Sequence, residues 1–196
     1  MKTIATIAAI AAASLTGLAS ASTTLIDFEG LADDDVVTNQ FANVTFSSQP
    51  GSVVYVTEQP GVGIGDNFIC SGLANNMINC VDEVLLDFTS AVSNLSFFAV
   101  GDNNVGVVGQ VEVFVDNMLA GTVDLIADGN FATTEFVDLT AFNNVTGIRI
   151  FNITDAAGLG YDNFEFDVGM AEVPVPAAAL LFVGGAAGFV RRRKDA

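Results

Sequence analysis

Gln110-Val111-Glu112-Val113-Phe114-Val115-Asp116 is the segment whose pattern most clearly indicates secondary structure. Valine occupies every second position, and a period of two places one face of an extended strand against a core. Valine and phenylalanine also favour strands over helices. The segment therefore predicts a β-strand with one buried face.

Similar runs recur through the middle of the chain, at residues 24–28, 44–47, 53–57, 84–88, 95–100, 134–139, 147–152 and 163–168. Turn-forming residues separate them, including 101–104 and 128–130, and we interpret 124–130 as a hairpin turn. No middle segment of useful length shows the helical period of 3.6 residues. The sequence predicts an all-β domain of about nine strands, an antiparallel β-sandwich of the jelly-roll kind.

The N-terminus has the organisation of a secretory signal. Lys2 precedes an apolar run from Ile4 to Leu18, and Ala19-Ser20-Ala21 follows with the small residues of a cleavage site. We therefore expect a signal peptide over residues 1–21, in helical form, and export of one domain over residues 22–172.

Charge is distributed unevenly along the chain. It holds 6 Lys and Arg against 23 Asp and Glu, and Arg149 is the one basic residue between residues 22 and 172. Nucleic-acid binding draws its non-specific affinity from Lys and Arg, so a nucleic-acid partner is excluded. The acidity serves either solubility or the recruitment of divalent cations, and the two are compatible.

Cysteine and histidine usage limits the chemistry. The two cysteines, Cys70 and Cys80, are predicted to form one disulfide in an oxidising compartment. Without histidine the chain has no Ser-His-Asp or Cys-His pair, and the middle region has no lysine for a Schiff base. Two carboxylates would still suffice for a glycoside hydrolase.

The aromatic residues are 16 Phe, 2 Tyr and no Trp. We interpret most of the phenylalanines as core, among them Phe28, Phe46, Phe88, Phe97, Phe164 and Phe166. Sugars commonly stack on exposed rings that also offer a polar group, and Tyr55 and Tyr161 are the candidate ligand-binding residues of this type.

The C-terminus, residues 173–196, combines three features. Val173, Pro174, Val175, Pro176 and Ala177 form a proline-containing motif, an apolar stretch runs to Val190, and Arg191, Arg192, Arg193 and Lys194 follow. The stretch predicts a short transmembrane helix, and the basic cluster is expected to stop translocation and stay in the cytoplasm.

This tail resembles the PEP-CTERM sorting signals of Gram-negative bacteria, closest to the Val-Pro-Leu-Pro-Ala variant with Val175 in place of leucine. The resemblance implies an exosortase partner that recognises the tail at the inner membrane. It also implies that the exported domain reaches the cell surface or the extracellular matrix. An anchor that is never cleaved remains the alternative.

The domain itself resembles MAM-type and galactose-binding-like jelly rolls through Asp27-Phe28-Glu29 near its start and Tyr161-Asp162-Asn163-Phe164 near its end. The resemblance implies first and last strands that lie close together, with a structural Ca²⁺. Strand alternation would turn Phe28 and Phe164 inward and leave Asp27, Glu29 and Asn163 on the opposite face. Asp162 would reach the same metal site only through a bulge or a strand end.

These observations predict an exported, non-catalytic surface or matrix protein that binds polysaccharide with calcium support. A secreted carboxylate-based glycoside hydrolase and a purely structural coat protein are the alternatives. An open face would favour binding, whereas a groove with paired carboxylates would favour the hydrolase.

Overall fold

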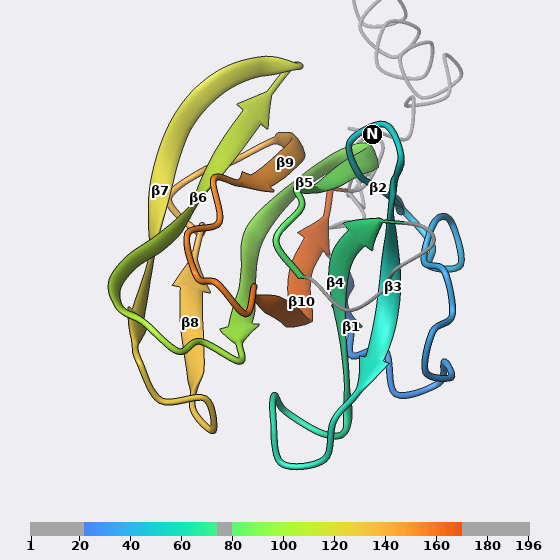
Figure 1. Cartoon of the computed structure of the whole chain (residues 1–196). Helices are drawn as coiled ribbons and strands as arrows, with labels where there is room; N and C mark the ends of the chain where they lie inside the picture. The colour runs from blue at the N-terminus through green and yellow to red at the C-terminus, as the bar shows by residue number, and fades with distance from the viewer. Residues whose placement is uncertain (1–21, 74–79, 170–196) are drawn as a thin grey trace, which may run out of the picture.

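A computed structural model describes residues 22–73 and 80–169 of the 196-residue chain (Figure 1). The predicted signal peptide, sorting motif, transmembrane helix and basic cluster lie outside these residues. The described residues form ten strands: β1 Ser22–Ile26, β2 Val44–Ser47, β3 Ser52–Glu58, β4 Asn67–Leu73, β5 Val84–Val100, β6 Val105–Val115, β7 Met118–Asp128, β8 Thr134–Asp138, β9 Val145–Phe151 and β10 Gly160–Val168. The described residues contain no helix, and the predicted all-β class is confirmed.

Every pairing between these strands is antiparallel. The 17-residue strand β5 belongs to both halves of the domain. Its first part pairs with β2 and β9, and β9 continues through β6 to β7. Its last part pairs with β8 and β10, and β10 continues to β1, β4 and β3 (Figure 1). This arrangement is consistent with a β-sandwich.

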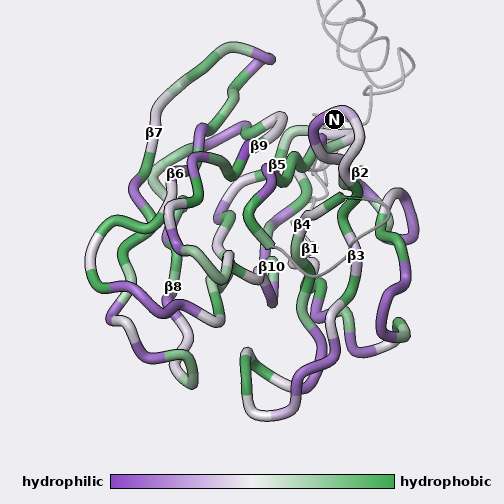
Figure 2. Tube along the Cα trace, in the orientation of Figure 1, coloured by the Kyte–Doolittle hydropathy of each residue, from purple (hydrophilic) through white to green (hydrophobic). Residues whose placement is uncertain are grey.

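One large hydrophobic core lies between the strands, and apolar residues alternate with polar ones along much of the trace (Figure 2). Aromatic rings dominate its centre. The Phe164 ring stacks on Phe97 with centroids 4.9 Å apart and meets Phe46 and Phe28 edge to face at 5.9 and 6.1 Å. All six phenylalanines predicted as core are buried.

Two strands of the structure, β4 and β7, were not predicted from the sequence. Strand β4 is buried at six successive positions, so its sequence shows no alternation. Strand β7 is a largely exposed outer strand whose inward positions include Gly121 and Ala127, and this weakens its pattern. The segment 124–130 is consequently not a turn throughout, because β7 continues to Asp128.

The predicted strand at 110–116 is the last part of β6. It ends in a two-residue hairpin turn at Asp116 and Asn117, which both adopt positive φ angles of 51° and 60°. This turn fixes the pairing of β6 with β7 and places Val105 opposite Asp128 at the far end of the hairpin. Two turns of the chain, 101–104 and 129–133, therefore lie side by side.

In residues 22–73 and 80–169, no helix is long and apolar enough to cross a membrane.

Candidate functional site

The first and last strands meet as the sequence predicts, and a bulge changes what they present. β1 pairs with β10 along its whole length. Asn163 has a positive φ of 47°, and the register between β10 and β5 shifts after Asp162. Alternation is lost at this bulge, so Tyr161 and Asp162 are both buried. Asp162 was expected to reach the predicted metal site only through a bulge or a strand end, and such a bulge is present.

The connection between β3 and β4 lies over this bulge. The Ile64 N–H donates to Asp162 Oδ2 at 3.0 Å, and the N–H groups of Asp66 and Asn67 donate to Glu29 Oε1 at 3.0 and 3.1 Å. Gly65 has a φ of 113°, and a Cβ at this position would collide with the Glu29 carboxylate. Glycine is therefore needed for the backbone to approach the carboxylates this closely.

The Asp162 carboxyl has a perturbed acidity. Its pKa is raised from 3.8 to about 6. Burial is the largest cause, the N–H donors of Ile64 and Asn163 act in the opposite direction, and the Glu29 and Asp27 carboxylates add to the rise. Between these two pKa values the folded chain keeps a proton that the unfolded chain has released. The contribution of Asp162 to stability therefore falls as the pH rises through this window. A cation bound to the ionised carboxylate would offset this loss.

Two buried side-chain amide oxygens near the bulge have no hydrogen-bond partner. Asn67 donates its Nδ2 to the carbonyls of Leu31 and Phe28 at 2.9 and 3.4 Å, while its Oδ1 is buried without a partner. The Oδ1 of Asn163 is also buried without a partner. Amide and carboxylate oxygens are the donors that calcium takes, so the chemistry of this site fits the ion.

The predicted metal ligands are brought together only in part. Asp27 and Glu29 are exposed beside the loop, and Asp162 is buried beneath it. Among the described residues, these three carboxylates do not form a group whose oxygens all lie within 4.8 Å. Phe28 and Phe164 point into the core as predicted. We refer below to Asp27, Glu29, Asp162 and Asn163 as the bulge site.

A second acidic cluster was not predicted. One carboxylate oxygen from each of Asp102, Asp128 and Glu135 lies within 4.8 Å of the other two, and the three residues could hold a metal ion. Asp102 follows β5, Asp128 ends β7 and Glu135 belongs to β8. We call these three residues the turn cluster.

The sequence contains a signal for the turn cluster. Asp116-Asn117 is a dipeptide suited to a two-residue hairpin turn, and pairing strands outward from it brings residue 105 opposite residue 128. Asp102 and Asp128 then occupy neighbouring turns. Glu135 could not be placed in this way, since β8 pairs with β5 and not with its sequence neighbour β7.

The structure corrects the expectation that the two tyrosines are available to a ligand. Tyr161 and Tyr55 are each 1% exposed, because both belong to strands with covered faces. Tyr161 packs edge to face on Phe97. Burial, with the nearby carboxylates of Asp34, Asp33 and Asp82, raises the pKa of Tyr55 to about 12, so its phenol stays neutral.

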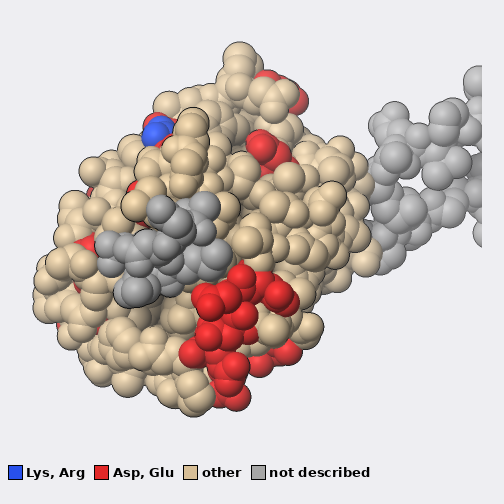
Figure 3. All heavy atoms as spheres, turned by 45° about the vertical axis from the view of Figure 1, so that its right-hand side comes forward, with Lys and Arg blue, Asp and Glu red and all other residues tan. Residues whose placement is uncertain are grey.

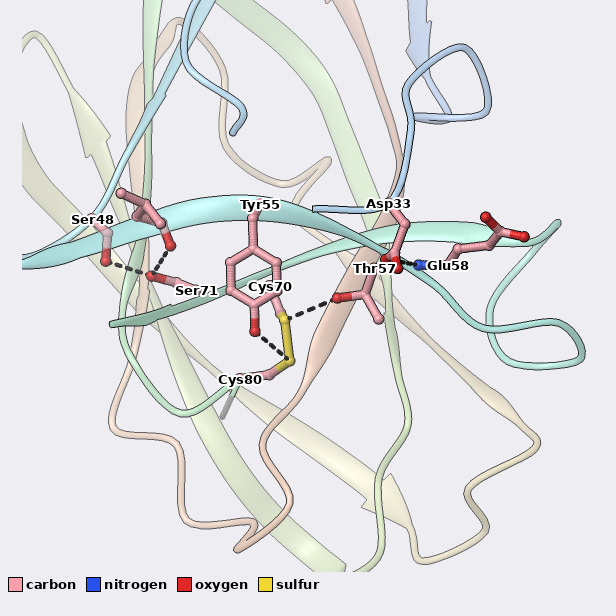
Figure 4. Close-up of a disulfide and its surroundings, with 9 residues drawn as sticks. Asp33, Ser48, Tyr55, Thr57, Glu58, Cys70, Ser71 and Cys80 are labelled. Carbon is pink, nitrogen blue, oxygen red and sulfur yellow. Dashed lines mark hydrogen bonds between the residues drawn. A yellow bond between two sulfur atoms is a disulfide. The ribbon is translucent and has the colours of Figure 1, made fainter. Parts of the chain in front are cut away.

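The predicted disulfide between Cys70 and Cys80 is confirmed. It joins β4 to the segment before β5, and the Tyr55 hydroxyl lies 3.8 Å from Cys80 Sγ (Figure 4). Cys70 is buried, and Cys80 is half-buried. A disulfide of this kind is typical of proteins that fold in an oxidising compartment.

Four hollows on the described surface are small. One of about 130 Å³ is lined by Asp102 and Glu135, and one of about 240 Å³ is lined by Tyr55, Gly101 and Phe131. Two further hollows measure about 190 and 210 Å³. Pockets that enclose small-molecule ligands usually measure roughly 300–1,000 Å³. These hollows suit contact with a surface better than enclosure of a substrate.

Acidic side chains gather on one face of the domain (Figure 3). The loop after β1 carries Asp33, whose Oδ1 accepts the Glu58 N–H at 2.9 Å, and Glu29, which accepts the Asp66 N–H. The carboxylates of Asp33 and Glu29 thus lie against the backbone of Glu58 and Asp66. Arg149, the single basic residue of the described part, is paired with Glu83 and Glu112.

No family model and no curated protein sequence matches the chain. Among solved structures, it is similar to a cyclase from Fischerella sp. TAU, with 12% identity over 78% of this chain and 100% of that chain and a TM-score of 0.48. It is also similar to the K1 cleaved adhesin domain of Lys-gingipain from Porphyromonas gingivalis W83 (16% identity, 76% and 99% coverage, TM-score 0.37). A third is the CBM36-1 domain of a multidomain xylanase from the hindgut metagenome of Trinervitermes trinervoides (12% identity, 78% and 100% coverage, TM-score 0.27). At these identities and TM-scores, the likenesses assign no function.

Proposed function

We propose that the chain is an exported, non-catalytic protein of the cell surface or extracellular matrix, and that its β-domain binds polysaccharide with the support of calcium. The observation that carries this proposal is the bulge site. There the carboxylate of Asp162 is buried against the loop that Glu29 also holds. An ionised carboxylate in this position favours a bound cation, and calcium accepts the oxygen donors present.

The shape of the surface supports binding over catalysis. Glycoside hydrolysis requires two carboxylates about 5–10 Å apart on either side of a bound sugar. The hollow beside the turn cluster, about 130 Å³, leaves little room for a sugar ring. This lack of room makes the glycoside hydrolase the second candidate, and the carboxylates of Asp102 and Glu135 at the hollow are the observation in its favour. A structural coat protein without a ligand is the third.

In this proposal, the terminal segments direct the export and sorting of the domain. The signal peptide at 1–21 directs export, and an exosortase recognises Val173–Ala177 while the C-terminal helix holds the chain in the inner membrane. The disulfide agrees with an oxidising destination. The cluster Arg191–Lys194 keeps the C-terminus in the cytoplasm until the tail is processed.

Charge determines which polysaccharide to test. The chain carries a formal net charge of −17, so it repels an acidic polysaccharide unless divalent cations bridge the two. We expect labelled oligouronates to bind the full chain, kept soluble in mild detergent, in calcium and to dissociate in EDTA. Fluorescence anisotropy measures this binding, and a neutral dextran oligosaccharide is the control for non-specific contact.

The same samples separate the three candidates. Release of reducing ends from the oligouronates would establish the hydrolase in place of the binding protein. Equal anisotropy in calcium and in EDTA, with no reducing ends, would contradict calcium-supported binding and favour the coat protein.

A further inference from the structure

The turn cluster brings three carboxylates together, and within residues 22–73 and 80–169 no positive side chain is among its hydrogen-bond partners. The carboxylate oxygens of Asp102, Asp128 and Glu135 lie within 4.8 Å of one another. Arg149 is occupied elsewhere by Glu83 and Glu112. Like charges this close repel one another unless a proton or a cation joins them.

Backbone and hydroxyl groups already engage one oxygen of each carboxylate. The Gly129 N–H donates to Asp102 Oδ2 at 2.6 Å, and the Asp128 N–H donates to Glu135 Oε1 at 3.2 Å. Asp128 Oδ1 accepts the Asn130 N–H at 2.8 Å and the Thr133 hydroxyl at 2.9 Å. These bonds fix the three carboxylates and leave a second oxygen on each.

The second oxygen of Asp102 is an independent observation that points to a ligand. Asp102 is 1% exposed, and its Oδ1 is buried without a hydrogen-bond partner. Buried carboxylate oxygens are normally paired, because leaving one unpaired is costly. This carboxylate is aimed at the other two, since one of its oxygens belongs to the 4.8 Å group.

We propose that Asp102, Asp128 and Glu135 bind a calcium ion that ties the β7–β8 turn to the β5–β6 turn. The cluster offers oxygens alone, which suits a hard cation, whereas zinc would call for nitrogen or sulfur donors. Asp128 is exposed, so water completes the coordination sphere from the solvent side. This site is separate from the bulge site and does not depend on the proposed function.

The ion would order the end of the domain that carries Phe131. The Phe131 ring and the Val62 side chain both pack over Gly101, next to Asp102. Phe131 is 37% exposed and lines the hollow of about 240 Å³. Holding residues 129–133 in place therefore fixes an exposed aromatic ring at the rim of that hollow.

Isothermal titration of the full chain in mild detergent with calcium chloride tests the site. We expect Asp102→Asn and Glu135→Gln each to remove one calcium-binding event or to weaken it by about tenfold or more. Asp116→Asn, an equal loss of charge at the opposite end of the β6–β7 hairpin, is the matched control and should leave calcium uptake unchanged. Amide hydrogen exchange of residues 128–135 should slow in calcium in the unaltered chain but not in Glu135→Gln.

The two sites give different outcomes. Asp162→Ala removes the ion of the bulge site only, so the event lost with Asp102→Asn should persist in the Asp162→Ala chain. If the bulge site binds no calcium, the unaltered chain shows a single calcium-binding event, and Glu135→Gln still removes or weakens it. Calcium uptake by Asp102→Asn and Glu135→Gln equal to that of Asp116→Asn would overturn the proposal.

Discussion

Replacing Phe164 by alanine is expected to lower the free energy of unfolding by about 3–5 kcal/mol, the range for deleting a large buried aromatic side chain. The Phe164 ring is fully buried and contacts the rings of Phe97, Phe46 and Phe28. These rings come from both halves of the domain, so the cavity would open at their junction. Domains of this kind have about 5–15 kcal/mol of total stability.

Urea unfolding in EDTA measures this effect without a contribution from calcium. Phe136→Ala is the matched control, because its ring is 58% exposed and meets Phe98 at the surface. We expect a loss of less than about 1 kcal/mol for it. Similar losses for the two variants would show that Phe164 is not at the centre of the core.

Reducing the Cys70–Cys80 disulfide should lower the free energy of unfolding by about 2–3 kcal/mol, since the bond closes a short loop in the unfolded chain. The domain should stay folded after reduction. Asp82 holds this region through Gln49 and Ser52 at 2.8 and 2.7 Å, and Leu159 donates its N–H to the Cys80 carbonyl.

Urea unfolding with and without reductant gives the difference. A chain with both Cys70→Ala and Cys80→Ala is the control, and its unfolding midpoint should not respond to reductant. An unaltered chain whose midpoint also ignores reductant would contradict a stabilising role for the disulfide.

The fold could be predicted from sequence where one face of a strand is buried. Alternating valines identified β6, and buried phenylalanines identified the core. The strands that escaped prediction lack this contrast: β4 is covered on both faces, and β7 is largely exposed. The continuity of β5 also escaped prediction, because its middle part changes pairing partners between the two halves.

The two candidate sites differ in how far sequence reasoning reached them. The bulge site was proposed from the resemblance of residues 27–29 and 161–164 to the start and end of known jelly rolls, and the observed pairing of β1 with β10 agrees with that resemblance. The role of residues 63–67 above it could not be predicted, because these residues bind the carboxylates through backbone N–H groups, which do not depend on residue type. The turn cluster depends on two strand pairings. The Asp116-Asn117 turn is a sequence signal for the pairing of β6 with β7, whereas sequence alone did not supply the pairing of β5 with β8.

The melting temperature of the full chain as calcium is added tests the central claim most directly. At pH 7 we expect a rise of about 5 °C or more at calcium far above its dissociation constant. Glu29→Ala and Asp162→Ala should each reduce that rise. The rise should also shrink at pH 5, because Asp162, with its pKa of about 6, is then mostly protonated and a poorer ligand. An equal rise in all three chains, or none in the unaltered chain, would contradict calcium binding at the bulge site.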